Sequence, residues 1–186
     1  MCESFVNNIA NLSLNTYESL GKTGKPTADE WTTLCSIVIE ENNTFLVACL
    51  ATGTKCVTGQ WASFKGAVID CHAECLCKRA FKRFLISHVQ SGKSFDTAKF
   101  HLFISQLPCG VVDRYKGNID KPCVGVRRKP GKGERCLKPS CVDKLCKWNI
   151  LGLQGRRLLA FTKKPIRFET IIIGNCGQEN EFDENK

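Results

Sequence analysis

The sequence lacks several features that would assign it to whole classes of protein. It contains no run of 18 or more apolar residues, so a membrane span is not expected. Residues 1–5 include an acid and lack the basic start and apolar stretch of a secretory signal peptide. No internal repeat is found along the chain. These absences predict an intracellular protein, located in the cytoplasm, the nucleus or both.

Cysteine, by contrast, is abundant, with 13 residues in a chain of 186. Small disulfide scaffolds have less aliphatic content than this chain, whose apolar share is 42%. Several cysteines (Cys35, Cys49 and Cys56) lie in apolar segments, where a reduced thiol behaves as a small apolar side chain. We therefore interpret the chain as reduced, with a minority of its cysteines on metal. The length fits one domain, or one domain with a short extension.

The net charge of +9 is unevenly placed along the chain. The tail at residues 177–186 is acidic and is expected to be disordered, whereas basic residues gather between Arg114 and Lys147. A basic surface of this kind suits a polyanion such as RNA. An ordinary solvated loop would explain the same charges equally well, so charge alone leaves both interpretations open.

Apolar periodicity predicts an α/β domain in which helices cover a sheet. Helices are expected at residues 5–20, 72–88 and 141–151, and strands at residues 31–40, 44–56, 100–105 and 166–173. Residues 41–43 are predicted to form a hairpin turn, and residues 110–140 a long loop rich in Gly, Pro and Lys.

One pair of motifs carries chemistry. His72-Ala73-Glu74 and the later Pro108-Cys109 match the H-x-E and P-C parts of the signature of zinc-dependent nucleobase deaminases. That chemistry needs a neutral imidazole on the metal and a carboxylate beside the reacting water. Glu74 alone would be explained as a helix N-terminal carboxylate that the helix dipole favours.

The third metal ligand is less obvious, because a catalytic zinc site needs three protein ligands and an open position. The compact form of the signature places a second cysteine three positions after Cys109, where Val112 stands. Cysteines further along the chain are the candidates, namely Cys123, Cys136, Cys141 and Cys146. Cys141 is the best of them by position, because it opens a predicted helix as His72 does. Cys75 and Cys77 lie too close to His72 to add ligands, and nothing distinguishes His88 or His101 from ordinary surface or core histidines.

Several motifs in matching order resemble the adenosine-deaminase (editase) domain, the family of the ADAR enzymes and the tRNA adenosine-37 deaminases. The resemblance covers residues 5–175. Its motifs are Thr52-Gly53-Thr54-Lys55-Cys56, Asp70-Cys71-His72-Ala73-Glu74 with Lys78-Arg79, Leu107-Pro108-Cys109-Gly110, Ser140-Cys141-Val142-Asp143-Lys144, and Trp148 to Gly155. Lys25-Pro26 ahead of Glu30-Trp31-Thr32 resembles the tRNA branch in particular.

The resemblance implies a cytidine-deaminase-like fold of three α/β/α layers around a central mixed sheet, with the domain at residues 1–176. It implies that His72, Cys109 and Cys141 bind zinc and that Glu74 is the general acid/base. The implied reaction is the hydrolytic deamination of adenosine to inosine in tRNA, at anticodon-loop adenosine 37, with alanine tRNA as the expected substrate. Thr54 and Lys55 match positions near the flipped nucleotide. Neither DNA nor a membrane is an expected partner.

In ADAR enzymes an inositol hexakisphosphate lies under the zinc site, and this chain has basic residues at matching positions. They are Lys78, Arg79, Lys144 and Lys147, with Asp70 linking Lys144 toward the metal. The family's domain continues beyond the length of this chain and supplies much of that pocket, so the domain is expected to be incomplete at its C-terminus. A non-catalytic, zinc-stabilised RNA-binding domain is the alternative, although a structural zinc site has no need of Glu74. Cytidine deamination is disfavoured by the wide separation of Cys109 and Cys141.

Overall fold

A computed structural model describes residues 3–57, 63–111 and 138–174. The main sheet has the strand order β2-β1-β5-β6. Its strands are β1 (Leu34–Glu41), β2 (Thr44–Thr52), β5 (Lys99–Ile104) and β6 (Phe168–Ile173). β1 is antiparallel to both of its neighbours, whereas β6 is parallel to β5, so the sheet is mixed as expected.

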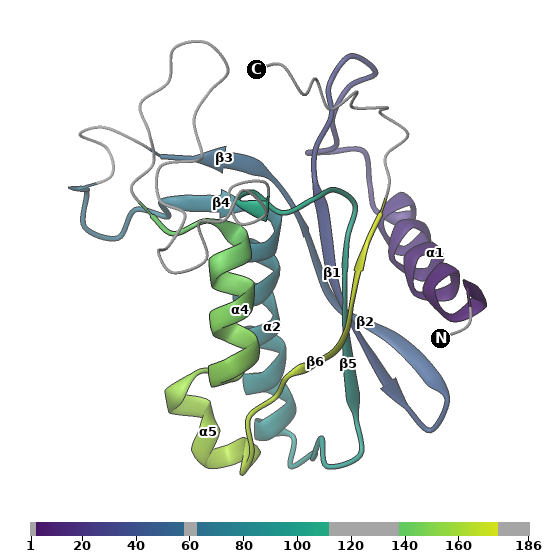
Figure 1. Cartoon of the computed structure of the whole chain (residues 1–186), viewed down its shortest axis with the longest axis vertical. Coiled ribbons are helices and arrows are strands. Elements are labelled where there is room, and N and C mark those ends of the chain that lie inside the picture. The colour runs from purple at the N-terminus through teal and green to yellow at the C-terminus, as the bar shows by residue number, and fades with distance from the viewer. Residues whose placement is uncertain (1–2, 58–62, 112–137, 175–186) are drawn as a thin grey trace.

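Helices cover both faces of this sheet (Figure 1). One face is covered by α1 (Glu3–Ser19), and the other by α2 (Ala73–Gln90), α4 (Cys141–Leu151) and the short α5 (Arg156–Thr162). Successive residues of the central strand β1 contribute to the two sides alternately: Leu34 and Val38 pack with Ile9 of α1, whereas Ile37 packs with Phe81 of α2. The three-layer α/β/α fold with a central mixed sheet is therefore confirmed.

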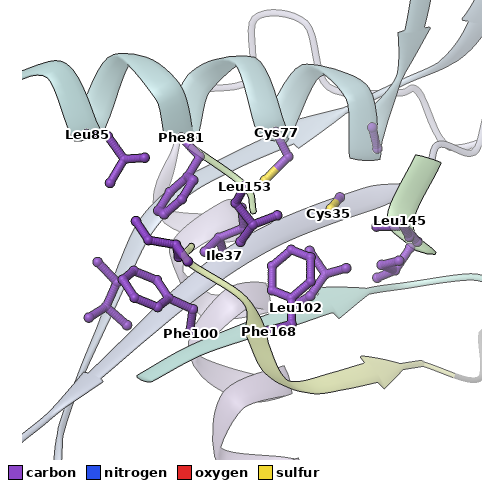
Figure 2. Packing of buried hydrophobic residues seen from close by; sticks show 14 residues of the cluster. Cys35, Ile37, Cys77, Phe81, Leu85, Phe100, Leu102, Leu145, Leu153 and Phe168 are labelled. Carbon is purple, nitrogen blue, oxygen red and sulfur yellow. The ribbon is translucent and has the colours of Figure 1, made fainter. Parts of the chain in front are cut away.

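The larger core lies between the sheet and α2 (Figure 2). Phe81 and Leu85 project from α2 onto Ile37 and Leu102 of the sheet, and all four side chains are buried. α4 contributes Leu145 to the same cluster. Because α2 and α4 share this core, the N-terminal ends of the two helices are held in a fixed relation to each other.

The hairpin turn between β1 and β2 forms where the sequence predicts it. Asn42 and Asn43 have φ values of 51° and 59°, and Glu41 is paired with Thr44. A two-residue turn with positive φ at both central positions matches the twist of the flanking strands, and asparagine tolerates that conformation.

The prediction of one strand over residues 44–56 is wrong, because the strand ends at Thr52. Gly53 leaves the sheet, and the short β3 (Thr54–Cys56) pairs instead with β4 (Asp70–His72). The Gly53 carbonyl accepts a hydrogen bond from the Ala73 N–H over 2.8 Å, and a Cβ at Gly53 would lie 2.2 Å from the Cys71 carbonyl oxygen. Only glycine allows this approach, which places β4 and the start of α2 against the end of β2.

The remaining expected elements are present with boundaries shifted by one to three residues, apart from α4, which spans residues 141–151 as predicted. β4 and α5 were not predicted, since neither is long enough to produce a periodic pattern. The predicted acidic tail and most of the predicted loop at 110–140 lie outside the described residues. In the described part of the chain, no helix is both long and apolar enough to cross a membrane.

Candidate metal centre

Three segments that are far apart in the sequence meet at one end of the sheet. His72 is the last residue of β4 and the N-cap of α2, Cys109 follows β5, and Cys141 is the first residue of α4. One ligand atom from each of these residues lies within 4.8 Å of the other two. The structure therefore brings together the three residues that the resemblance named as ligands.

The spacing of these atoms fits a tetrahedral metal. The Nδ1 atom of His72 lies 3.3 Å from the Cys141 Sγ and 3.8 Å from the Cys109 Sγ. Zinc–sulfur and zinc–nitrogen bonds at tetrahedral angles place the two ligand atoms about 3.5 Å apart. Among the alternative ligands, Cys146 is exposed on α4 and is not part of this group, whereas Cys123 and Cys136 lie outside the described residues.

Backbone contacts fix Cys109 against the start of α4. The Cys141 N–H donates to the Cys109 Sγ over 3.2 Å, and the Val142 N–H donates to the Cys109 carbonyl over 3.1 Å. Hydrogen bonding with the Cys141 thiol, outweighing burial, lowers the pKa of Cys109 to about 5. The same contact raises the pKa of the Cys141 thiol. A thiolate is the form that binds metal, so of the two cysteines it is Cys109 that these contacts prepare as a ligand.

The start of α4 is itself held by a buried cap. Ser140 is fully buried, and its Oγ accepts a hydrogen bond from the Asp143 N–H and donates one to the Asp143 carboxylate. The Ser140 hydroxyl therefore caps the helix by satisfying one backbone N–H of its first turn, and the Asp143 carboxylate holds that hydroxyl in place. Gly110 packs directly on Ser140, since a Cβ at Gly110 would lie 2.4 Å from the Ser140 Oγ. The cap and the glycine therefore position the Cys141 thiol and the Cys109 segment together.

Glu74 lies in the first turn of α2, two residues after His72, and its side chain is buried. Burial raises the pKa of Glu74, with a smaller contribution from the neighbouring Cys109, while His72 and the Cys141 thiol oppose the shift. A raised pKa makes the protonated form easier to reach, which suits a carboxyl group that takes up a proton and then releases it. Its proximity to Cys141 places it beside the ligand group.

Thr54 and Lys55 are exposed and lie next to this group. They belong to β3, in which Thr54 is paired with His72 and Lys55 with Cys71. Directly paired residues of antiparallel strands project to the same side, so Thr54 shares its side with the His72 ligand. Thr54 is therefore placed beside the candidate metal site, whereas Lys55, the next residue of the strand, projects to the opposite side of this two-stranded sheet.

A cavity of about 1070 Å³, which we call the basic cavity, opens beside α2 and α4. All four basic residues that the resemblance named line it, together with Asp70. Lys82 and Arg156 also line the cavity and add two more cations, which the sequence analysis did not identify. The i+4 spacing of Lys78 and Lys82 could have indicated that Lys82 lies on the same helix face. Burial, followed by repulsion from Lys82 and Lys147, lowers the pKa of Lys78 to about 8.

The two histidines that the motifs did not single out have structural surroundings. His101 is buried in β5 and contacts the Glu40 carboxylate over 3.0 Å, and His88 stacks on Phe95. Neither belongs to a metal-binding group among the described residues. Cys77 is likewise a core residue, whose Sγ lies 3.6 Å from that of Cys49.

Comparison with known proteins agrees with this geometry. The family model described as the adenosine-deaminase (editase) domain matches residues 49–98 and 111–184, more than half of the chain. The chain belongs to this family. Within the matched region lie His72, Glu74 and Cys141, while Cys109 lies in the short gap between the two matched segments.

Members of the editase family from several organisms are similar over most of the chain. The tRNA-specific adenosine deaminase 1 of Drosophila melanogaster is 34% identical over 92% of the chain, and that of Schizosaccharomyces pombe is 32% identical over 90%. The double-stranded RNA-specific adenosine deaminase of Rattus norvegicus is 28% identical over 92% of the chain. The chain spans 56% of the length of each of the two tRNA-specific relatives and 20% of the third.

Proposed function

We propose that this editase-family chain carries out the zinc-dependent hydrolytic deamination of adenosine to inosine in tRNA, at adenosine 37 of the anticodon loop of alanine tRNA. The observation that carries the proposal is the group of His72, Cys109 and Cys141 with the buried Glu74 beside it. The higher identity to the tRNA-specific relatives than to the double-stranded RNA-specific one supports tRNA as the substrate.

The donor set of one imidazole and two thiolates suits zinc and leaves a fourth position open. A zinc ion in this site would supply Lewis acidity, which lowers the pKa of water and makes it nucleophilic near neutral pH. The adenine must leave its stack to reach the site, and a loop nucleotide is already partly unstacked. Thr54, which pairs with His72, and the neighbouring Lys55 would contact the ribose or phosphate of that nucleotide.

Glu74 moves the protons in this mechanism. Its carboxylate accepts one proton from the water that attacks C6 of adenine and gives it to the ring nitrogen N1. It then takes the second proton from the new C6 hydroxyl and gives it to the amino group, which leaves as ammonia while the C6 carbonyl forms. The products are inosine and ammonia. The raised pKa of Glu74 suits both halves of this role, because the group must be a base first and an acid afterwards.

The test compares the wild type with Glu74→Gln on an alanine tRNA transcript, with inosine and zinc content as the two readouts. We expect inosine from the wild type only, with zinc retained by both proteins. Glu3→Gln is the matched control, because Glu3 is an exposed carboxylate in the first turn of another helix, α1. Activity that survives in Glu74→Gln would refute the mechanism. Zinc-loaded wild type without activity would favour an RNA-binding zinc domain.

We also propose that the basic cavity binds inositol hexakisphosphate, as the resemblance implies. Six cations line the cavity against two carboxylates, those of Asp70 and Asp143. Lys78 also lies 4.5 Å from the centre of the Trp148 ring. Burial is the main cause of the lowered pKa of Lys78, and repulsion from neighbouring lysines adds to it; a bound polyanion would relieve that repulsion.

Native mass spectrometry and thermal unfolding with added inositol hexakisphosphate test this assignment. We expect one bound polyphosphate and a raised melting temperature in the wild type. Both effects should be absent in the double variant Lys82→Glu/Lys147→Glu. They should be retained in the control Lys22→Glu/Arg83→Glu, which changes the net charge by the same amount at exposed residues outside the cavity. Equal stabilisation of the two variants would refute the assignment.

A further inference from the structure

A second cavity of about 240 Å³, which we call the distal cavity, lies at the end of the sheet opposite the metal centre. It is formed by the segment between α2 and β5 and by the segment between α5 and β6, which meet at the bottom of the view in Figure 1. The Lys164 ammonium joins the two segments by donating to the Asp96 carbonyl over 3.2 Å. This cavity shares no residue with the basic cavity.

The distal cavity is basic at its rim and aromatic inside. Five cations line it, namely Lys93, Lys99, Lys163, Lys164 and Arg167, against the carboxylates of Asp96 and Glu169. Lys99 is committed to an ion pair with Glu40 at 3.3 Å. Among the described residues, no carboxylate lies within ion-pair distance of Lys93, Lys163 or Lys164. The rim therefore carries positive charge that no described carboxylate pairs with directly.

The aromatic part of the cavity is partly open to solvent. Phe95 and the buried Phe100 lie inside, whereas Phe161, at the C-terminal end of α5, is 62% exposed. Lys163 directly after α5 has a φ of 59°, a conformation that lysine rarely adopts and that costs free energy. An exposed aromatic ring beside unneutralised cations suits a ligand that has both an anionic group and a planar ring.

We propose that the distal cavity is a second RNA-binding site, which takes a backbone phosphate on Lys163 and Lys164 and an unstacked base on Phe161. The inference rests on the proposed function, because that function makes RNA the polyanion that the protein meets. α2 begins at the metal centre and ends at Gln90 beside this cavity, so the two sites lie about 27 Å apart, the length of an 18-residue helix.

Binding of a fluorescently labelled alanine tRNA transcript to the full chain over a range of salt concentrations tests the site. The variants are Lys163→Glu/Lys164→Glu and Phe161→Ala, whose side chains are exposed, and Lys22→Glu/Arg83→Glu is the control of equal charge. We expect the lysine variant to bind about tenfold more weakly than the control, with a salt slope smaller by about 0.7 to 0.9 for the one phosphate contact that is lost. Phe161→Ala should bind about fivefold more weakly or worse, with an unchanged salt slope.

Kinetics separate this proposal from the chemistry at the metal. Because the distal cavity is remote from Glu74, both variants should raise the KM for tRNA and leave kcat unchanged. The proposal would be overturned if the lysine variant bound tRNA as tightly as the charge control. It would also be overturned if Phe161→Ala bound tRNA as tightly as the wild type. If the wild type forms no inosine, the proposed function fails, while the binding comparison still decides whether the distal cavity holds RNA.

Discussion

Asp70 of β4 and Lys144 of α4 form an ion pair that joins the two segments carrying His72 and Cys141. The other carboxylate oxygen of Asp70 accepts a hydrogen bond from the His72 N–H over 3.1 Å, and its carbonyl accepts one from the Arg79 guanidinium over 2.6 Å. Asp70 therefore links the backbone of one metal ligand to the helix of another. It also connects the metal centre to the basic cavity, whose wall includes Arg79 and Lys144.

Replacing Asp70 by Asn should weaken zinc binding by about tenfold or more, because residues that orient metal ligands contribute on this scale. The substitution also leaves the partly buried Lys144 without this carboxylate, which destabilises the fold. Adding Lys144→Met to Asp70→Asn should recover part of the lost stability without restoring zinc affinity. Competition with a chelator and thermal unfolding measure the two effects, and additive losses of stability in the double variant would contradict the coupling.

Gly110→Ala should disrupt the metal centre through sterics alone. The added Cβ would meet the buried Ser140 Oγ at 2.4 Å, so the Cys109 segment must move away from α4. We expect substoichiometric zinc by metal analysis and a loss of roughly 2 kcal/mol or more in the free energy of unfolding. Gly92→Ala is the control, because Gly92 also has positive φ but has no atom within 4 Å of its added Cβ. Similar zinc content in the two variants would refute this reading.

Gly53→Ala should destabilise the fold by roughly 3 kcal/mol or more, since its Cβ would collide with the Cys71 backbone. The collision pushes β4 away from the end of β2 and breaks the hydrogen bond from Ala73. Denaturant unfolding measures the loss, with Gly24→Ala as the control for an unobstructed glycine of positive φ. An unfolding midpoint equal to that of Gly24→Ala would show that β4 can shift freely.

Binding of inositol hexakisphosphate should weaken as the pH rises through about 8. The pKa of Lys78 is lowered to about 8, so the ammonium is charged below that pH and neutral above it, and the polyanion binds the charged form. Above this pKa, binding of the polyphosphate requires Lys78 to take up a proton. The affinity for inositol hexakisphosphate therefore falls with rising pH, by up to about tenfold per pH unit. Lys78→Arg should show a flatter profile by calorimetry, because arginine keeps its charge. Parallel profiles for the two proteins would exclude Lys78 as the titrating group.

The sequence predicted the layers and the ligands because both leave patterns in it. Strand β1 contains a continuous run of apolar residues, such as Ile37 and Val38, which is the pattern of a buried strand. Helix α2 repeats apolar residues on one face, such as Phe81 and Leu85, which is the pattern of an amphipathic helix. The ligand group was found through motif order rather than spacing. Its place at the start of a predicted helix makes Cys141 the best candidate by position, but it is the resemblance to the editase domain that selects it among the cysteines.

What the sequence could not show depends on contacts between distant segments. The break at Gly53 is imposed by the Cys71 carbonyl, which belongs to a strand too short to be recognised. The distal cavity is formed by two loops more than 60 residues apart, joined through Lys164 and Asp96. In the sequence its lysines look like ordinary solvated residues, and the ring of Phe161 has no visible partner.

The two hydrogen bonds from the start of α4 to Cys109 have an evolutionary consequence. They clamp together the two ends of the stretch between Cys109 and Cys141, as would a metal bound to both. Once a loop is pinned at its base, doubling its length costs only about 0.6 kcal/mol of closure entropy. The placement of Cys109 beside Cys141 therefore does not depend on how long the connecting chain is, so evolution could lengthen that connection at little cost while the two thiols stay together.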